Sequence, residues 1–259
     1  MFSLNGKRAF ITGGSSGIGR AIAELFVENG AKVVIADIVD ATDVANEIGA
    51  TYLQCNVSDE QSVAGSLEAA VAALGGKLDT VVLNAGVGDV GPSFEDTEQG
   101  MLEKVTKINQ WGVLYGLKHA PKYMQDDGSI IATSSMASKV SMPGTGVYSA
   151  AKAAVNSMVS MAALELGDRG IRVNSLCPGY VNTALGNTPE ERKCSETMTA
   201  LGRHAEPKED IAPVFVFFAS DASRYVTGQA LSVDAGMDNG PTARLLELVT
   251  GTSAAPGSH

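Results

Sequence analysis

Short runs of apolar and β-branched residues alternate along the chain with longer amphipathic segments. The apolar runs fall near residues 7–12, 32–36, 51–55, 79–83, 129–134, 171–177 and 229–233. Runs of about four to eight such residues between glycines and polar residues are typical of buried strands. Strands that alternate with helices form parallel sheets, with right-handed crossovers that cover both faces. The pattern predicts an α/β fold in which one doubly wound, seven-stranded parallel sheet carries helices on both faces.

We expect one domain over residues 1–250, because a chain of 259 residues can bury a full core and such folds commonly form a single domain. Residues 251–259 lack apolar periodicity, so we expect a disordered tail there. Residues 186–206 are polar and include Asn187, Thr188 and Pro189, after the sixth predicted strand. We interpret this segment as a mobile lid over a substrate site, with a plain surface connection as the alternative.

A glycine-rich turn follows the first predicted strand. Its sequence is Gly13-Gly14-Ser15-Ser16-Gly17-Ile18-Gly19, and a helix is predicted after it over residues 20–29. Glycines let a backbone approach a pyrophosphate closely, and a helix N-terminus offers free N–H groups to the anion. The spacing is G-x-x-x-G-x-G, which differs from the common dinucleotide fingerprint, and glycine also ends strands for purely steric reasons.

An acidic residue ends the second predicted strand. Asp37 stands eighteen residues beyond Gly19, where a carboxylate can accept both hydroxyls of an adenosine ribose and repels a 2′-phosphate. The neighbouring Ser16 and Ile38 supply no cation that would hold such a phosphate. The sequence therefore favours NAD over NADP, and the alternative is that Asp37 only caps the helix that follows.

Tyr148 and Lys152 stand four residues apart on a helix predicted over residues 147–167, with Ser135 thirteen positions before the tyrosine. An i, i+4 pair projects from one face of a helix. Because a nearby ammonium favours phenolate over phenol, we expect Lys152 to lower the tyrosine pKa from its usual value of about 10. The alternative is a half-buried tyrosine beside a solvated lysine.

Taken together, these motifs resemble those of the short-chain dehydrogenase/reductase family, in its single-domain branch. The resemblance covers roughly residues 4–237 and keeps the family's order and spacing. It includes the glycine turn with Thr12, then Asn84-Ala85-Gly86 after the fourth strand, Asn109 on the next helix, Ser135 after the fifth strand, Tyr148 with Lys152, and Pro178-Gly179 after the sixth strand.

The resemblance implies an NAD-dependent oxidoreductase with catalytic residues Asn109, Ser135, Tyr148 and Lys152. Tyr148 would exchange a proton with the substrate oxygen, and Ser135 would hydrogen-bond that oxygen as charge develops on it. Lys152 would lower the phenol pKa and bind the nicotinamide ribose, while Asn109 would hold a water in a proton relay. Ser134 and Ser138 compete for the serine role, and the interval to Tyr148 favours Ser135.

The resemblance also implies a cofactor site along the ends of the strands. The residues expected to bind NAD are Gly13, Ser15, Ser16, Gly17, Ile18, Gly19, Asp37, Ile38, Asn56, Val57, Asn84, Ala85, Gly86, Tyr148, Lys152, Pro178, Gly179, Val181 and Thr183. Asn56-Val57 departs from the family's usual acid followed by a small apolar residue. An amide can still donate and accept at an adenine edge, so we expect altered contacts there.

The expected substrate-lining residues are mostly apolar and include no cation: Val87, Gly88, Val90, Met136, Ser138, Val140, Met142, Val147, Tyr180 and Leu185. A neutral secondary alcohol or ketone fits such a lining, cyclic ones included, and NAD favours the oxidative direction. One alternative is a ketoreductase of the 3-oxoacyl carrier protein type that uses NADPH. Another is a noncatalytic dinucleotide-binding scaffold, which the intact catalytic residues disfavour.

Composition and charge exclude several classes of partner and site. A net charge of −10 argues against nucleic acid as a partner, and unclustered Cys55, Cys177 and Cys194 argue against a disulfide framework or a metal site. Cys55 and Cys177 are expected to pack, and Cys194 to be exposed. No long apolar run or basic leader occurs, so we expect no membrane span, no signal peptide and a cytoplasmic location. Small and apolar residues occupy several faces of the helix over 147–167, and the family resemblance, whose members often pair this helix across a two-fold axis, implies a homotetramer or a homodimer.

Overall fold

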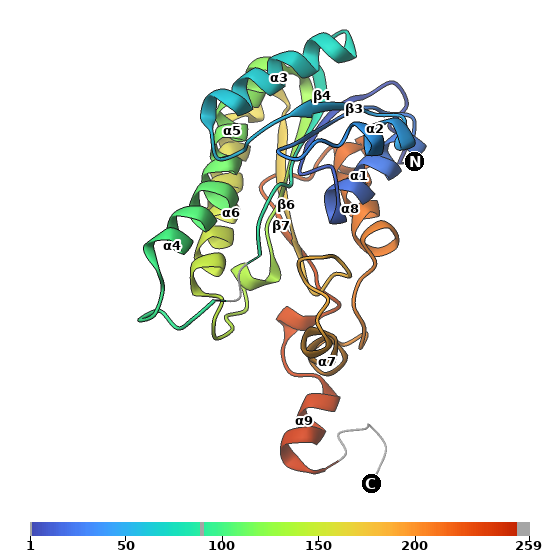
Figure 1. Ribbon diagram of the computed structural model, residues 1–259. Coiled ribbons are helices and arrows are strands. Elements are labelled where there is room, and N and C mark those ends of the chain that lie inside the picture. The colour runs from blue at the N-terminus through green and yellow to red at the C-terminus, as the bar shows by residue number, and fades with distance from the viewer. Residues whose placement is uncertain (1, 89–90, 253–259) are drawn as a thin grey trace.

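The computed structural model describes residues 2–88 and 91–252, and it contains a seven-stranded sheet in the order β3-β2-β1-β4-β5-β6-β7 (Figure 1). All strand pairs are parallel. The strands are β1 (Arg8–Thr12), β2 (Lys32–Asp37), β3 (Thr51–Gln54), β4 (Leu78–Leu83), β5 (Met124–Thr133), β6 (Arg172–Pro178) and β7 (Ala230–Val233). The predicted doubly wound α/β fold is confirmed, and β5 begins five residues earlier than expected.

Helices cover both faces of this sheet (Figure 1). One face carries α1 (Gly17–Glu28), α2 (Thr42–Ile48) and α8 (Ala212–Ala219). The other face carries α3 (Glu60–Leu74), α5 (Gly112–Tyr123) and α6 (Gly146–Glu165). Successive strand residues enter opposite cores, as Phe10 and Ile11 do, and both are fully buried. Burial on both faces explains why the strands read as continuous apolar runs.

The remaining helices lie at the ends of the sheet. Helix α4 (Gln99–Val105) continues through a π-helical turn, Thr106–Trp111, into α5. Helix α7 (Pro189–Met198) lies within the segment expected to be a lid, and Thr188 and Glu191 begin it with a reciprocal capping box. Helix α9 (Ala243–Thr250) projects away from the sheet beyond α7 (Figure 1). Most of the tail expected to be disordered, residues 253–259, lies outside the described residues.

The order of the strands fixes where a ligand can bind. From β1 the chain proceeds outward through β2 to β3, and it then returns to place β4 on the other side of β1. Such a reversal opens a crevice at the carboxyl ends of the strands. Within residues 2–88 and 91–252, no helix is both long enough and apolar enough to cross a membrane.

Candidate functional site

The glycine-rich turn lies between β1 and α1 and has no room for a side chain at Gly13 or Gly19. A Cβ added to Gly19 would lie 2.0 Å from the carbonyl oxygen of Gly13, and one added to Gly13 would lie 2.8 Å from Ala85 Cα. Helix α1 begins at Gly17, and in the described part of the chain the Ser16 side chain makes no capping hydrogen bond. The first N–H groups of α1 therefore remain available to an anion, as a pyrophosphate requires.

Asn84 holds this turn against the ends of two neighbouring strands. Its Nδ2 donates to the carbonyl oxygens of Thr12 at 3.2 Å and Gly13 at 3.3 Å. Its Oδ1 accepts from the Thr133 hydroxyl at 3.0 Å. The amide thus joins the carboxyl ends of β1, β4 and β5, and it keeps the glycine turn in a fixed position at the crevice.

Asp37, at the end of β2, faces the glycine turn. Its carboxylate accepts from the backbone N–H of Ser15 at 3.1 Å and from that of Val39 at 3.3 Å. The N-cap of the following helix is Ala41, and Asp40 accepts from Thr42. Among the described residues a capping role for Asp37 on α2 is therefore not observed, and its carboxylate lies against the glycine turn.

Asn56 and Val57 follow β3 and are used locally. Asn56 Oδ1 accepts from the Ser58 backbone N–H at 3.0 Å and from its hydroxyl at 2.7 Å. Val57 packs so closely on α5 that a Cβ at Gly112 would lie 3.0 Å from its Cβ. Among the described residues, Asn56 Nδ2 makes no hydrogen bond within this turn.

Asn109 lies in the π-helical turn Thr106–Trp111 and is completely buried. Its Oδ1 accepts from the Val87 N–H at 2.8 Å, and its Nδ2 donates to the Val87 carbonyl oxygen at 2.9 Å. A Cβ at Gly86 would lie 3.0 Å from Asn109 Oδ1 and 3.5 Å from Lys152 Nζ. The absence of a side chain at Gly86 therefore lets Asn109 approach the lysine. Turns of this kind inside helices occur frequently at functional sites.

Lys152 and Tyr148 come together on α6, as the i, i+4 spacing predicts. The Lys152 ammonium lies 5.8 Å from the centre of the Tyr148 ring and donates to the Thr133 carbonyl oxygen at 2.8 Å. The Ser134 hydroxyl donates to the Lys152 carbonyl oxygen at 3.0 Å, which fixes α6 against the end of β5. Burial lowers the pKa of Lys152 to about 8.

The expected effect of Lys152 on the phenol is not what the structure shows. Burial raises the pKa of Tyr148, and the Ser135 hydroxyl only partly opposes the rise. The reason is that Lys152 is fully buried and Tyr148 is largely buried, and burial disfavours the charged form of each group. The prediction from spacing alone omitted this burial.

Ser135 directly follows the carboxyl end of β5 and caps a short 3₁₀ turn, Met136–Ser138. Its Oγ accepts from the Ala137 N–H at 3.1 Å, which leaves its hydrogen for another acceptor. The competing hydroxyls are engaged elsewhere, since Ser134 donates to Lys152 and Ser138 donates to the Ser135 carbonyl oxygen at 2.5 Å. These contacts favour Ser135 among the three serines.

The segment after β6 reaches back to the glycine turn. A Cβ at Gly17 would lie 3.5 Å from the Thr183 methyl group, and one at Gly179 would lie 2.8 Å from Asp234 Cα. Val181 is buried and pairs with Ala205. The structure thus brings residues from β1, β4, β5 and β6 to one edge of the sheet.

The residues expected to line a substrate site differ in how far they are buried near these strand ends. Met136 is buried, the Tyr180 hydroxyl contacts the Met142 sulfur at 3.7 Å, and Leu185 is 66% exposed. Gly88 packs near Leu185, since a Cβ there would lie 3.6 Å from its carbonyl oxygen. Val140 and Val147 are partly buried. Val90 lies outside the described residues.

The contact between His204, in the segment expected to be a lid, and Tyr180 was not predicted. The His204 ring lies 5.6 Å from the Tyr180 ring, and its Nδ1 lies 2.7 Å from the Ser195 hydroxyl. Burial raises the pKa of Tyr180 to about 12. No local pattern indicates the contact of Tyr180 with His204, because these residues lie on separate segments. Asn156, on α6, was also missed.

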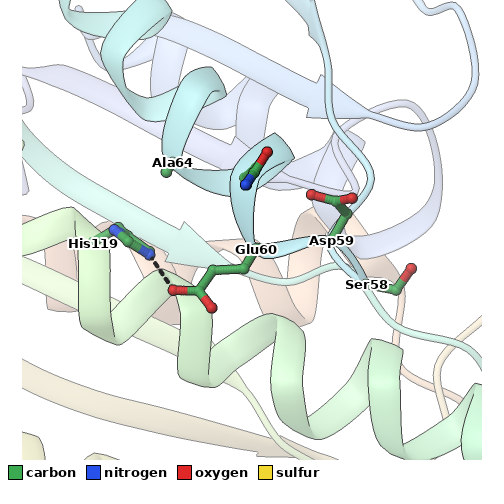
Figure 2. A pocket seen from close by; sticks show the side chains of 6 residues that line it. Ser58, Asp59, Glu60, Ala64 and His119 are labelled. Carbon is green, nitrogen blue, oxygen red and sulfur yellow. Dashed lines mark hydrogen bonds and ion pairs between the residues drawn. The ribbon is translucent and has the colours of Figure 1, made fainter.

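A surface hollow between α3 and α5 lies apart from these residues (Figure 2). His119 Nε2 lies 2.9 Å from a carboxylate oxygen of Glu60 within it, and Lys118 donates to the same oxygen. Among the described residues, no group of three or more His, Cys, Asp or Glu side chains is placed to hold a metal ion. Cys55 and Cys177 are buried and Cys194 is exposed, as expected.

Known proteins with similar sequences and structures cover almost the whole chain. A family model described as Enoyl-(Acyl carrier protein) reductase matches residues 13–238. Secoisolariciresinol dehydrogenase of Forsythia intermedia is 38% identical over 248 residues, which cover 90% of this chain and 89% of that protein. A mitochondrial borneol dehydrogenase of Lavandula x intermedia is 38% identical over 240 residues, with 90% and 91% covered.

Solved structures agree with these sequence relatives. A dehydrogenase/reductase from Sinorhizobium meliloti 1021 superposes with a TM-score of 0.86 at 32% identity, covering 91% of this chain and 96% of that one. A blue fluorescent protein from a metagenomic library, in complex with NADPH, superposes with a TM-score of 0.85 at 31% identity, covering 91% and 99%.

Proposed function

The chain belongs to the short-chain dehydrogenase/reductase family, and we propose that this oxidoreductase uses NAD to oxidise neutral, mostly apolar secondary alcohols. The observation that carries the proposal is the convergence of Ser135, Tyr148 and Lys152 at the edge of the sheet that also holds the glycine turn. A proton donor and acceptor, a second hydroxyl and a buried cation meet there.

When bound, the nicotinamide of NAD would supply the acceptor for the hydride of the carbon that carries the hydroxyl group. Tyr148, in its phenolate form, takes the hydroxyl proton as the carbon–oxygen bond becomes a carbonyl, and Ser135 donates a hydrogen bond to that oxygen. Lys152 keeps a positive charge beside the phenol and would hold the nicotinamide ribose. Asn109 holds the Val87 backbone beside the lysine, where a water relay would pass. The same groups act in reverse for ketone reduction.

The preference for NAD rests on Asp37. Its carboxylate faces the glycine turn, and the next residue, Ile38, is exposed and uncharged. A 2′-phosphate there would meet an anion and would find no cation in either side chain. The similar structure that holds NADPH keeps NADP as the alternative cofactor, and the assay described below compares the two.

The substrate class rests on the apolar lining and on the relatives. Met136, Met142 and Val147 supply apolar surface beside the catalytic groups, and Tyr180 adds a partly buried ring. Two relatives are named as dehydrogenases of secoisolariciresinol and of borneol. Borneol is a cyclic secondary alcohol. We therefore favour a neutral cyclic secondary alcohol, with the residues from 186 to 206 acting as the lid.

We further propose that the enzyme is a homotetramer or a homodimer. Apolar side chains remain exposed on the outer surfaces of α5 and α6, where Leu114 is 44%, Met161 is 59% and Leu164 is 78% exposed. Contact with another copy would remove this surface from water. The cytoplasmic location expected from the sequence remains a prediction.

The test is a panel of neutral cyclic and aromatic secondary alcohols, assayed by nicotinamide absorbance with NAD and, separately, with NADP. Borneol and cyclohexanol derivatives belong in the panel, along with a 3-oxoacyl thioester and NADPH for the ketoreductase alternative. We expect NAD-dependent oxidation of at least one cyclic alcohol. Activity confined to the thioester with NADPH would contradict the proposal, and binding of NAD without turnover of any compound would favour the scaffold alternative.

A further inference from the structure

Asn156 lies one helical turn beyond Lys152 on α6, and its side chain connects three elements of the site. Its Nδ2 donates to the Ser138 hydroxyl at 2.8 Å, in the 3₁₀ turn after Ser135. Its Oδ1 accepts from the Ser175 hydroxyl on β6 at 2.9 Å. The Cys177 sulfur lies 3.7 Å from both amide atoms. The helix with Tyr148 is thereby joined to the turn with Ser135.

The donor direction of this network is fixed by the number of hydrogens available. A serine hydroxyl has one hydrogen, and Ser138 donates it to the Ser135 carbonyl oxygen at 2.5 Å. That hydroxyl can then only accept a hydrogen bond from Asn156, and the Asn156 amide nitrogen donates one. The result is a directed chain from Asn156 through Ser138 to the backbone of Ser135. Hydrogen bonds in such chains strengthen one another.

We infer that Asn156 is a positioning residue for the dehydrogenase reaction, because it acts through Ser138 to fix the turn that presents the Ser135 hydroxyl to the substrate oxygen. The effect of Asn156 on catalysis rests on the proposed function, whereas the hydrogen bonds that hold the turn are observed independently of it. Asn156 itself touches no reacting atom. Its amide sets which way the Ser138 hydrogen points, and the Ser138 hydrogen holds the Ser135 carbonyl.

The Ser135 carbonyl oxygen also accepts from the Ser138 backbone N–H at 3.0 Å, so the Ser138 hydroxyl is one of two donors that hold it, and the Ser135 side chain itself has few anchors. Its Oγ accepts from the Ala137 N–H at 3.1 Å, within the same short turn. A shift of the turn therefore moves the hydroxyl with it. Catalytic donors are sensitive to such shifts, since a displacement of about 1 Å can cost about a hundredfold in rate.

The test compares Asn156→Leu, Asn156→Asp and Ser138→Ala with the control Ser157→Ala, which changes an exposed side chain on the same helix. Asn156→Asp keeps the shape and the acceptor for Ser175, but it cannot donate to Ser138. The Ser138 hydrogen then turns toward the new carboxylate and leaves the Ser135 carbonyl. We expect all three changes at Asn156 and Ser138 to lower kcat by at least about tenfold, with KM for NAD within about twofold.

A double-mutant cycle separates positioning from packing. If Asn156 acts through Ser138, adding Asn156→Leu to Ser138→Ala lowers kcat by less than about a further twofold. Hydrogen–deuterium exchange of residues 134–142 should become at least about tenfold faster in both single variants, and not in Ser157→Ala. Independent, multiplicative losses in kcat, or unchanged exchange, would overturn the inference.

The exchange measurement needs no substrate, so the two proposals fail separately. If wild-type protein oxidises no alcohol on the panel, the proposed function fails, while faster exchange in Asn156→Leu still supports the hold on the turn. If the enzyme is active and both Asn156 variants keep wild-type kcat, the positioning role fails and the proposed function stands.

Discussion

Lys152 Nζ lies 5.8 Å from the centre of the Tyr148 ring, and it donates its hydrogen bond to the Thr133 carbonyl oxygen at 2.8 Å. Burial acts on the two groups in opposite directions. It lowers the pKa of the lysine to about 8 and raises the pKa of the tyrosine. The ammonium is thus retained at neutral pH at a cost in stability, and the phenol holds its proton into the alkaline range.

The cost of burying Lys152 predicts that Lys152→Met stabilises the fold. A pKa lowered from 10.5 to about 8 corresponds to about 3 kcal/mol, at about 1.4 kcal/mol for each pH unit. Loss of the hydrogen bond to the Thr133 carbonyl offsets part of this stabilisation, so we expect a net gain of about 1–2 kcal/mol in the free energy of unfolding at pH 7. Urea unfolding of both proteins measures it. Activity should be lost at the same time.

The pH dependence of that gain identifies its cause. Above pH 8 the folded wild type loses the lysine proton, while the unfolded chain keeps it until about pH 10.5. The unfolded state therefore binds more protons in this window, and wild-type stability rises with pH. The advantage of Lys152→Met should shrink by about 2 kcal/mol between pH 8 and pH 9.5. An advantage that stays constant would show that burial of charge is not its source.

Asn109→Leu should destabilise the protein and lower turnover, because it removes both hydrogen bonds from the Val87 backbone. A buried backbone group left without a partner costs about 1–3 kcal/mol. We expect the free energy of unfolding to fall by about 2–4 kcal/mol, measured by urea unfolding. Asn46→Leu, at an exposed position of α2, should change it by less than about 0.5 kcal/mol. Equal effects of the two substitutions would contradict the role given to the π-helical turn.

Gly19→Ala should disrupt the cofactor turn. Its Cβ would lie 2.0 Å from the Gly13 carbonyl oxygen, so the backbone must shift where the pyrophosphate is expected. We expect the Kd for NAD, measured by calorimetry, to rise by at least about tenfold, or about 1.4 kcal/mol.

The matched control is Gly65→Ala in α3, where an added Cβ meets no described atom within 4 Å. That change should leave the Kd for NAD unaltered and stabilise the helix by about 0.5–1 kcal/mol. If Gly19→Ala bound NAD as well as Gly65→Ala does, the turn would not be the pyrophosphate site.

Asp37→Ala combined with Ile38→Arg should shift the cofactor preference toward NADP. The change removes a carboxylate that repels a 2′-phosphate and supplies a guanidinium that binds one. A shift of at least about a hundredfold in the ratio of kcat/KM values needs about 2.8 kcal/mol, within reach of one charged hydrogen bond and one lost repulsion. Asp40→Ala, which alters an exposed carboxylate nearby, should leave the ratio unchanged. A double variant that remains strict for NAD would place the ribose elsewhere.

The sequence predicted the sheet well because strands buried on both faces leave a strong apolar signal. Phe10 and Ile11 belong to one continuous run, although they enter opposite cores. The pairing of Tyr148 with Lys152 was equally accessible, since helical spacing determines it. These features depend on neighbours along the chain.

The features that the sequence did not reveal depend on contacts between distant segments. Asn156 meets Ser138 across eighteen residues, and neither residue belongs to a periodic pattern. The direction of the Tyr148 pKa depends on how deeply the ring is buried, which helical spacing does not fix. The π-helical turn at Thr106–Trp111 also left no mark in the apolar pattern.

The most direct test of the account is the pH–rate profile of alcohol oxidation by wild type and Tyr148→Phe between pH 6 and pH 8. Lys152 keeps its proton through most of this range, so the tyrosine proton controls the base. We predict that wild-type kcat/KM rises by about tenfold for each pH unit, and that Tyr148→Phe is at least about a hundredfold slower, with no such rise and unchanged NAD binding. A Tyr148→Phe enzyme with wild-type rates and the same pH dependence would contradict the central claim.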